Sequence, residues 1–286
     1  MARWQSELNL SLSEGLLMSK FILLLITLHI VSCGYSPWET KIDCRDYYQD
    51  NLQRLKQIEA ATSGQLAFNV AVLNDLHNNL SDIKTAVERI NQRDDVAFAL
   101  ILGDLTEQGL AVEFEWVCKA LADLKIPRFY VIGNHDSISF GKGIFLENFA
   151  PFDYAFTYKD VKFILYNDNV YEFPEAPDYA FLEKEAAIQG GETRRKTIGA
   201  SHSPPYPNEH TEEEATALRQ FLFDQNFDLT LHGHTSPLYL LDEFGTPHFT
   251  SYNVNGARYS MLFVSDADQL TLQRCMETCI DAILEN

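Results

Sequence analysis

Hydrophobic residues along this chain follow two periods in turn. Apolar runs at 68–73, 96–102 and 129–132 predict three short buried strands. Between them, apolar residues recur at helical spacing over 83–90 and 114–121, with Ser81 a predicted N-cap and Pro127 a predicted stop. Strands that alternate with helices in this way predict a parallel sheet covered by helices.

The remainder of the chain continues the α/β pattern. Alternating residues at 154–158 and 161–165 predict a hairpin, 181–187 a short helix, and 197–200 and 229–231 two more strands. Thr211 and Glu214 form a capping-box pattern at the start of a helix that extends through Leu222. After Pro237 the sequence favours strands to about residue 274, whereas Ser139–Pro151 is predicted to be a loop. We find no linker or internal repeat, so 65–286 is predicted to be one domain.

The first residues form a separate pattern. An apolar run at 21–31 follows Lys20 and precedes Ser32, Cys33 and Gly34. The run is too short to cross a bilayer, and it is typical of an export signal. Residues 30–33 are similar to the lipobox of bacterial lipoproteins, which are cleaved before a lipid-bearing cysteine. We therefore expect a signal at 1–32, a lipid on Cys33 and a lead-in at 33–64; a buried N-terminal strand or helix is the competing reading.

Export makes disulfide bonds permissible, so the cysteines carry information. Cys118 lies in a helical pattern and is predicted to be a buried thiol. Cys44 is predicted to pair with either Cys275 or Cys279, and the sequence does not choose between them.

Composition narrows the class of function. Lys and Arg number 22 against 41 Asp and Glu, which gives a formal charge of −19. Such a balance argues against a nucleic-acid groove and against a polybasic membrane surface. A hydrophobic fraction of 46% argues against a disordered chain, since it supplies enough apolar surface for a core.

Polar residues gather directly after five of the apolar runs. These clusters are Asp75–His77, Gly103–Glu107, Gly133–Asp136, His202–Pro204 and His232–Ser236. In open α/β sheets, ligands bind beyond the carboxyl ends of the strands, so we expect the clusters to converge there. Carboxylate, imidazole and amide oxygens in one place favour a divalent transition metal over Ca²⁺ or a thiolate zinc site.

This ordered set resembles the calcineurin-like metallophosphoesterases, over roughly residues 66–265. The motifs at 103–107 and 232–235 are similar to the branch that includes class III cyclic-nucleotide phosphodiesterases. The resemblance implies a four-layer αββα fold in a single α/β domain, and a dinuclear metal centre.

The resemblance also implies a role for each matching residue. Asp75 and His77 would bind the first metal, and the carboxylate of Asp104 would bridge both metals. The ligands of the second metal would be Asn134, His202 and His234. His135 would be the general acid or transition-state donor, and Asp136 would orient it.

One position departs from the family pattern. The family's last motif ends in a second histidine that binds the first metal, and this chain has Ser236 there. A hydroxyl is a poorer ligand than imidazole for most first-row divalent metals. Water or a nearby side chain such as His248 would complete the site, or the site would bind its metal weakly, or the protein would hold one metal and be slow or inactive.

The sequence therefore predicts an exported, lipid-anchored phosphoesterase that hydrolyses phosphomono- or diesters with a metal-bound hydroxide. The alternative is a single-metal lipoprotein that binds phosphate or a partner without catalysis. The metals could be Mn, Fe, Zn, Ni or Co, and the substrate a small or lipid-linked phosphoester read by loops at 139–151, 171–178 and 203–213, where Glu172 and Glu209 are acidic. Glu107 is interpreted as a helix-start carboxylate, with a contact to the site as the second reading.

Overall fold

The structure is a computed structural model that describes residues 20, 39–207, 209–235 and 239–281. The chain divides into two units, 1–39 and 40–286, and the second contains the elements described below. The expected signal at 1–32, apart from residue 20, lies outside the described residues, and so do Cys33 and Ser236. In the part of the chain that is described, no helix has the length and apolar character needed to cross a membrane.

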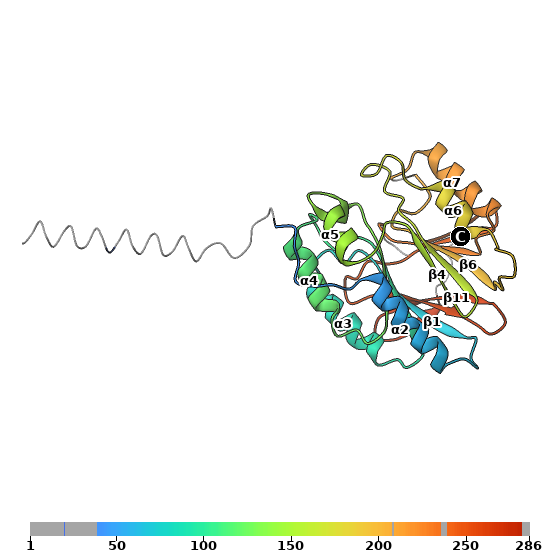
Figure 1. Ribbon diagram of the computed structural model, residues 1–286, viewed down its shortest axis with the longest axis horizontal. Coiled ribbons are helices and arrows are strands. Elements are labelled where there is room, and N and C mark those ends of the chain that lie inside the picture. Colours follow the sequence, from blue (N-terminus) through green and yellow to red (C-terminus); the bar gives the residue numbers. More distant parts are fainter. Residues whose placement is uncertain (1–19, 21–38, 208, 236–238, 282–286) are drawn as a thin grey trace, which may run out of the picture. The chain divides into compact units, whose positions relative to one another are not determined.

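Two six-stranded sheets form the centre of the unit (Figure 1). The first has the order β12-β11-β10-β1-β2-β3, and the second β4-β5-β6-β7-β9-β8. The strands of the first sheet are β1 (Phe68–Leu73), β2 (Val96–Leu102), β3 (Arg128–Val131), β10 (Tyr259–Val264), β11 (Leu270–Cys275) and β12 (Cys279–Asp281). Those of the second are β4 (Tyr154–Tyr158), β5 (Val161–Leu165), β6 (Lys196–Ala200), β7 (Leu229–His232), β8 (Tyr239–Glu243) and β9 (Thr246–Thr250).

Helices surround the two sheets. They are α2 (Tyr48–Ala61), α3 (Leu80–Asn91), α4 (Ala111–Leu121), α5 (Gly141–Asn148), α6 (Tyr179–Ala186), α7 (Glu212–Asp224) and the short η1 (His135–Ser137). Figure 1 shows α3 and α4 outside one sheet and α6 and α7 outside the other, which is the four-layer α/β arrangement that the resemblance implied.

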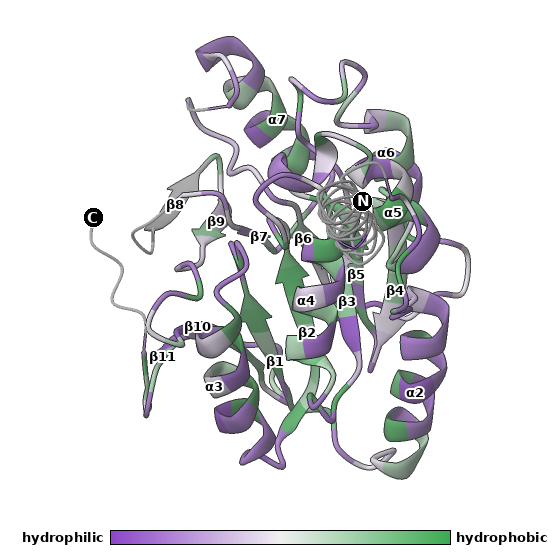
Figure 2. Ribbon diagram, turned by 90° about the vertical axis from the view of Figure 1, so that its left-hand side faces the viewer, coloured by the Kyte–Doolittle hydropathy of each residue, from purple (hydrophilic) through white to green (hydrophobic). Residues whose placement is uncertain are grey.

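The core explains why these segments form strands. Every residue of β1 and β2 is buried, because each strand is covered on one face by helices and on the other by the second sheet. Aromatic rings fill the space between the sheets: Phe98 contacts Phe163 edge to face, and Phe129 stacks on Phe156. Figure 2 shows strands β1 and β2 as mostly hydrophobic.

Parallel pairing places the site motifs at one edge. Strands β1, β2 and β3 run parallel to one another, and so do β5, β6, β7 and β9. The polar motifs that follow β1, β2 and β3 therefore lie at the carboxyl edge of the first sheet. The motifs that follow β6 and β7 lie at the carboxyl edge of the second sheet.

Several local predictions are confirmed. The hairpin of β4 and β5 turns at Lys159 and Asp160, both with positive φ, and Thr211 with Glu214 forms the predicted capping box of α7. Two local predictions are wrong. The N-cap of α3 is Asn79 rather than Ser81, and the loop predicted at 139–151 contains α5, because Ile144 and Phe145 bury one of its faces.

The lead-in at 33–64 is also different from what was expected. Residues 40–64 belong to the same compact unit as the sheets, and α2 packs on β2, β3 and β4. Asp46 accepts hydrogen bonds from Arg128 and Tyr130, so the segment before α2 is tied to β3. The compact unit thus begins before residue 65.

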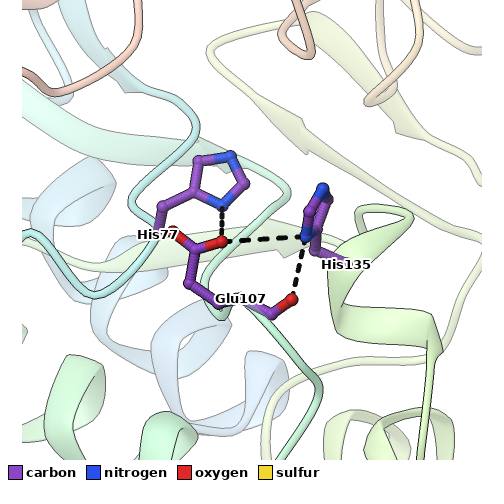
Figure 3. A group of neighbouring side chains, drawn as sticks. All are labelled: His77, Glu107 and His135. Atoms are coloured by element: carbon purple, nitrogen blue, oxygen red, sulfur yellow. Dashed lines mark hydrogen bonds and ion pairs between the residues drawn. The ribbon is translucent and has the colours of Figure 1, made fainter.

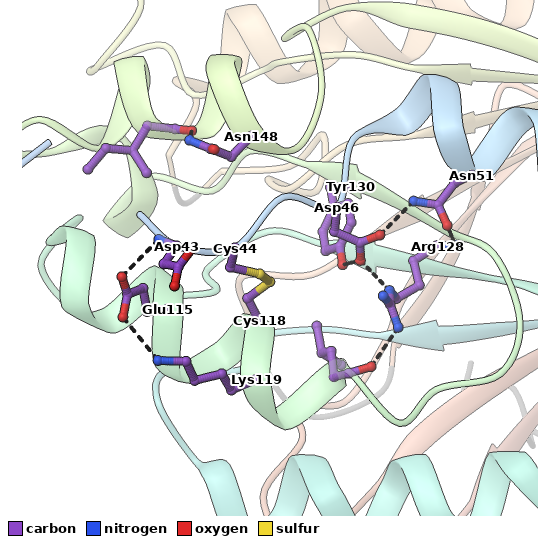
Figure 4. The surroundings of a disulfide bond; sticks show 12 residues. Asp43, Cys44, Asp46, Asn51, Glu115, Cys118, Lys119, Arg128, Tyr130 and Asn148 are labelled. Atoms are coloured by element: carbon purple, nitrogen blue, oxygen red, sulfur yellow. Dashed lines mark hydrogen bonds and ion pairs between the residues drawn. A yellow bond between two sulfur atoms is a disulfide. The ribbon is translucent and has the colours of Figure 1, made fainter. Parts of the chain in front are cut away.

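The cysteine predictions are wrong. Cys44 is bonded to Cys118, which is therefore not a free thiol (Figure 4). Cys275 is bonded to Cys279. The segment before α2 runs along α4, where the amide of Asp43 donates to Glu115, and this brings Cys44 to the buried face of α4. Cys275 and Cys279 face each other across the β11–β12 hairpin, with Cα atoms 4.1 Å apart.

Candidate metal centre

Most of the predicted metal ligands lie on strained turns directly after strands. Asp75, His77, Asp104 and His234 have φ values of 46°, 39°, 51° and 65°. Non-glycine residues seldom adopt this left-handed region, and such residues cluster at functional sites.

Two glycines allow the turns to meet. At Gly103, which has a φ of +86°, a Cβ atom would lie 2.5 Å from His202 Nδ1. At Gly133 it would lie 2.2 Å from Asp104 Oδ1. Both glycines are therefore required by the close approach of one motif to another.

The predicted second-metal ligands surround one small space. His202 Nε2 lies 3.0 Å from Asn134 Oδ1, 3.2 Å from His234 Nδ1 and 3.4 Å from Asp104 Oδ2. His202 Nδ1 is 2.7 Å from the carbonyl oxygen of Leu102, which can only accept, so Nδ1 carries a proton and donates it.

Burial acts to lower the pKa of His202, but the carboxylates of Asp104 and Asp75 outweigh it and raise that pKa to about 10, so without a metal Nε2 also carries a proton. A divalent cation bound in this space would take the place of that proton on Nε2. One carboxylate, one amide oxygen and two imidazole nitrogens around one small space, with Asp104 and His202 buried, fit a divalent cation.

The predicted first-metal ligands form a more open group. His77 Nε2 lies 3.4 Å from Asp104 Oδ2, and Asp75, His77 and Asp104 have ligand atoms within 4.8 Å of one another. The side chain of His77 is 25% exposed, whereas that of His202 is fully buried. The amide of His234 donates to Asp75 Oδ1 and joins this group to the second one.

The two carboxylates differ in their electrostatic environment. Burial raises the pKa of Asp75 to about 6, and the charge of Asp104 adds to the effect while His202 opposes it. Burial acts on Asp104 too, but His202, His77 and His135 outweigh it and lower the pKa of Asp104 to about 2. Asp104 thus remains ionised between the two groups, as a bridging ligand must.

His135 contacts Glu107, as Figure 3 shows. Nδ1 of His135 is 2.9 Å from the backbone oxygen of Glu107, so Nδ1 donates and Nε2 remains available for proton transfer. The Glu107 carboxylate lies 3.7 Å from His77 Nδ1 and 4.0 Å from His135 Nδ1. Burial acts to lower the pKa of His135, but the Glu107 hydrogen bond and the negative charges of Asp104 and Glu107 outweigh it and raise that pKa.

The interpretation of Glu107 as a helix-start carboxylate is corrected by this geometry. Helix α4 begins at Ala111, and it is Glu113 that accepts from the amides of Gln108 and Leu110 before it. Glu107 instead faces two of the predicted site histidines. Its place in the same motif as Asp104, three residues later, was the signal in the sequence.

Asp136 does not contact the ring of His135 in the way expected, and instead it binds the turns that follow β2 and β3. Its carboxylate accepts from the amides of Leu105, Thr106 and Gly133 and from the hydroxyl of Thr106. These bonds join the turn after β2 to the turn after β3. The expected orientation of His135 comes from Glu107 in this structure, and Asp136 supports the turns that carry both residues.

His248, the spare histidine considered for the first site, lies elsewhere. It is fully buried in β9, and its Nδ1 is 2.6 Å from the hydroxyl of Thr230 on β7. None of the metal-binding groups found among the described residues includes it. Glu209, by contrast, has an oxygen 3.1 Å from His234 Nε2, a contact that the sequence analysis did not predict.

Structural comparisons show the same architecture in several proteins. GAP50, the anchor in the inner membrane complex of Plasmodium, has a TM-score of 0.55 and 14% identity, over 77% of this chain and 90% of that one. Purple acid phosphatase PPD1 from yellow lupin has a TM-score of 0.56 and 14% identity, over 75% of this chain and 53% of that one. A putative 5'-nucleotidase from Staphylococcus aureus has a TM-score of 0.51 and 12% identity, over 77% of this chain and 55% of that one. This chain therefore matches only about half of the length of the phosphatase and of the nucleotidase. Such low identities show the fold alone.

Sequence comparisons give the family. No curated protein matches the chain. The family model described as calcineurin-like phosphoesterase matches residues 68–237, more than half of the chain and all five strand-end motifs up to Pro237. Members of this family are typically dinuclear metal enzymes that hydrolyse phosphoesters, and the convergent acceptor groups agree with that chemistry. The chain belongs to the calcineurin-like phosphoesterase family.

Proposed function

We propose that this protein hydrolyses phosphomono- or diesters with two divalent metals held by Asp75, His77, Asp104, Asn134, His202 and His234. The observation that carries the proposal is the convergence of carboxylate, amide and imidazole ligand atoms around His202 Nε2. When bound, two such ions would offset the charge of a phosphoryl group and activate a water molecule as the nucleophile.

The residues of the chain divide the remaining work. Asp104 stays ionised and joins the two groups of ligands, because the surrounding histidines lower its pKa to about 2. Nε2 of His135 holds the proton that passes to the leaving oxygen, since Nδ1 is engaged by the backbone of Glu107. Asp136 ties together the two turns that present Asp104 and His135.

The cellular setting is part of the proposal. Lys20, the apolar run at 21–31 and Cys33 support export and a lipid anchor on the periplasmic or extracellular face. The two bonded cysteine pairs agree with an oxidising compartment. The motifs at 103–107 and 232–235 support the branch that includes class III cyclic-nucleotide phosphodiesterases.

A metal-loaded panel tests this function. The purified chain, supplied with Mn²⁺, Zn²⁺ or Fe²⁺, is assayed with aryl phosphomonoesters, aryl phosphodiesters and cyclic nucleotides. Turnover that requires both the metal and Asp104 supports the proposed phosphoesterase activity. A preference for cyclic nucleotides supports the branch that includes class III cyclic-nucleotide phosphodiesterases. Absence of turnover on all three classes overturns it.

Ser236 favours a second candidate, a single-metal lipoprotein that binds phosphate or a partner without catalysis. Metal stoichiometry separates the two. One tightly bound ion with no hydrolysis supports binding, whereas two ions with turnover support the enzyme.

A further inference from the structure

Glu209 lies where the loop that follows His202 returns to the site. Its Oε1 is 3.1 Å from His234 Nε2, and the two side chains are 22% and 13% exposed. The other ring nitrogen of His234, Nδ1, lies 3.2 Å from His202 Nε2. One nitrogen of this ring thus faces the proposed second metal while the other faces a carboxylate.

Hydrogen bonds hold two residues of this loop, Ser203 and Tyr206, which precede Glu209. Near its start, the amide of Ser203 donates to the buried carboxylate of Asp168. In its middle, the hydroxyl of Tyr206 lies 3.2 Å from that of Thr235 and 2.9 Å from that of Thr250. Thr235 directly follows His234, so the loop that carries Glu209 is tied to the turn that carries its partner.

We propose that Glu209 is a positioning residue that orients His234 for the second metal. A carboxylate can only accept, so it keeps the proton of His234 on Nε2 and leaves the lone pair of Nδ1 for the ion. It also fixes the angle of the ring and strengthens the imidazole as a ligand. The inference rests on the proposed function only in requiring that a divalent metal binds.

Negative charge near the site would also favour a cation, and Glu172 allows the two effects to be separated. Burial raises the pKa of Glu172, and the negative charges of Glu209 and Asp104 add to the effect while Lys142 opposes it, so this carboxylate feels the charge of the site. None of the contacts found in the described part of the chain joins it to His234. Glu172→Gln therefore removes a comparable charge and leaves the ring contact in place.

The experiment uses the full chain, stripped of metal with chelator, with Glu209→Ala, Glu209→Gln and Glu172→Gln. Mn²⁺ binding is measured by calorimetry, and Co²⁺ binding by its visible absorption spectrum. We expect Glu209→Ala to weaken one Mn²⁺ ion by about 10–100-fold and to change the Co²⁺ spectrum. Glu209→Gln, whose amide oxygen still accepts from Nε2, should recover most of the loss, and Glu172→Gln should stay within about threefold of wild type.

The outcomes are distinct. Equal Mn²⁺ affinity in wild type and Glu209→Ala overturns the positioning role and leaves the phosphoesterase proposal standing. Equal losses in Glu209→Ala and Glu172→Gln show a charge effect and also overturn it. A folded wild-type chain that binds no divalent metal overturns both proposals. Thermal unfolding of the metal-free variants at the same temperature as wild type shows that the fold is intact.

Discussion

The two groups of predicted metal ligands share Asp104 but differ in how completely the protein surrounds them. In the second group, His202 is fully buried and its Nδ1 donates to the carbonyl oxygen of Leu102, while Nε2 of His234 contacts the carboxylate of Glu209. Around the first, His77 is 25% exposed, and the position that would supply a further ligand is Ser236, outside the described residues. A ligand that is buried and held in one orientation loses less freedom on binding, so the second group should bind its ion more tightly.

The largest effect should come from the residue that both groups share. Asp104→Ala removes the bridging carboxylate, so both ions should be lost and kcat/KM should fall on the order of 10³-fold or more. Metal content and turnover of an aryl phosphate measure this. Glu88→Ala, on the exposed side of α3, is the matched control. Retention of two ions by Asp104→Ala would contradict the shared role.

Substitution of one ligand from each group should distinguish the affinities of the two metal ions. His202→Ala should abolish the tighter Mn²⁺ ion, with a loss greater than the roughly 10–100-fold that follows removal of an outer hydrogen-bond partner. His77→Ala should abolish only the weaker ion. Calorimetric titration of the metal-free variants resolves the two steps, and the comparison fails if His77→Ala removes the tighter one.

Restoring the missing imidazole should reduce the difference between the groups. Ser236→His is expected to raise the affinity of the weaker ion by about tenfold or more, because imidazole is the better ligand for first-row metals. Turnover at limiting metal should rise with it, and Ser236→Ala is the control for the loss of the hydroxyl. An unchanged weaker affinity would show that another group already completes the site.

The smallest effects should appear in the stability of the metal-free protein. Because the pKa of Asp75 is raised to about 6, its ionisation opposes folding as pH rises from about 4 to 6, so Asp75→Asn should stabilise at pH 7 and have little effect below pH 4. The lowered pKa of Asp104, about 2, stabilises the fold above about pH 4, and this is lost as pH falls through 2.

Asp104→Asn should therefore destabilise the protein at pH 7. Changes on the order of 1 kcal/mol in chelator, measured by urea unfolding across pH, would support both signs. Shifts of the same sign for the two variants would contradict them.

Much of the site could be predicted because it is local. Each motif directly follows a hydrophobic run, and parallel strands end at one edge, so the sequence predicts that Asp75, Asp104 and His202 lie near one another. Glu107 was visible in the motif of Asp104, but the sequence could not show that Glu113, rather than Glu107, serves the start of α4.

Contacts between distant segments could not be predicted in the same way. The bond between Cys44 and Cys118 depends on the path of the segment before α2 across α4, which no local pattern encodes. Asp136 was expected beside the ring of His135, yet three backbone amides and one hydroxyl compete for its carboxylate and hold it between the turns.

The sequence by itself determined the α/β class, the order of the strands along the chain and the motifs at their ends, because hydrophobic period and turn residues act over short distances. Only the tertiary structure decided which nitrogen of each histidine faces the site, which carboxylate backs it and which cysteines pair. Those choices depend on left-handed turns such as that at Asp104 and on packing between segments far apart in the chain, where burial and competing hydrogen bonds select the partner.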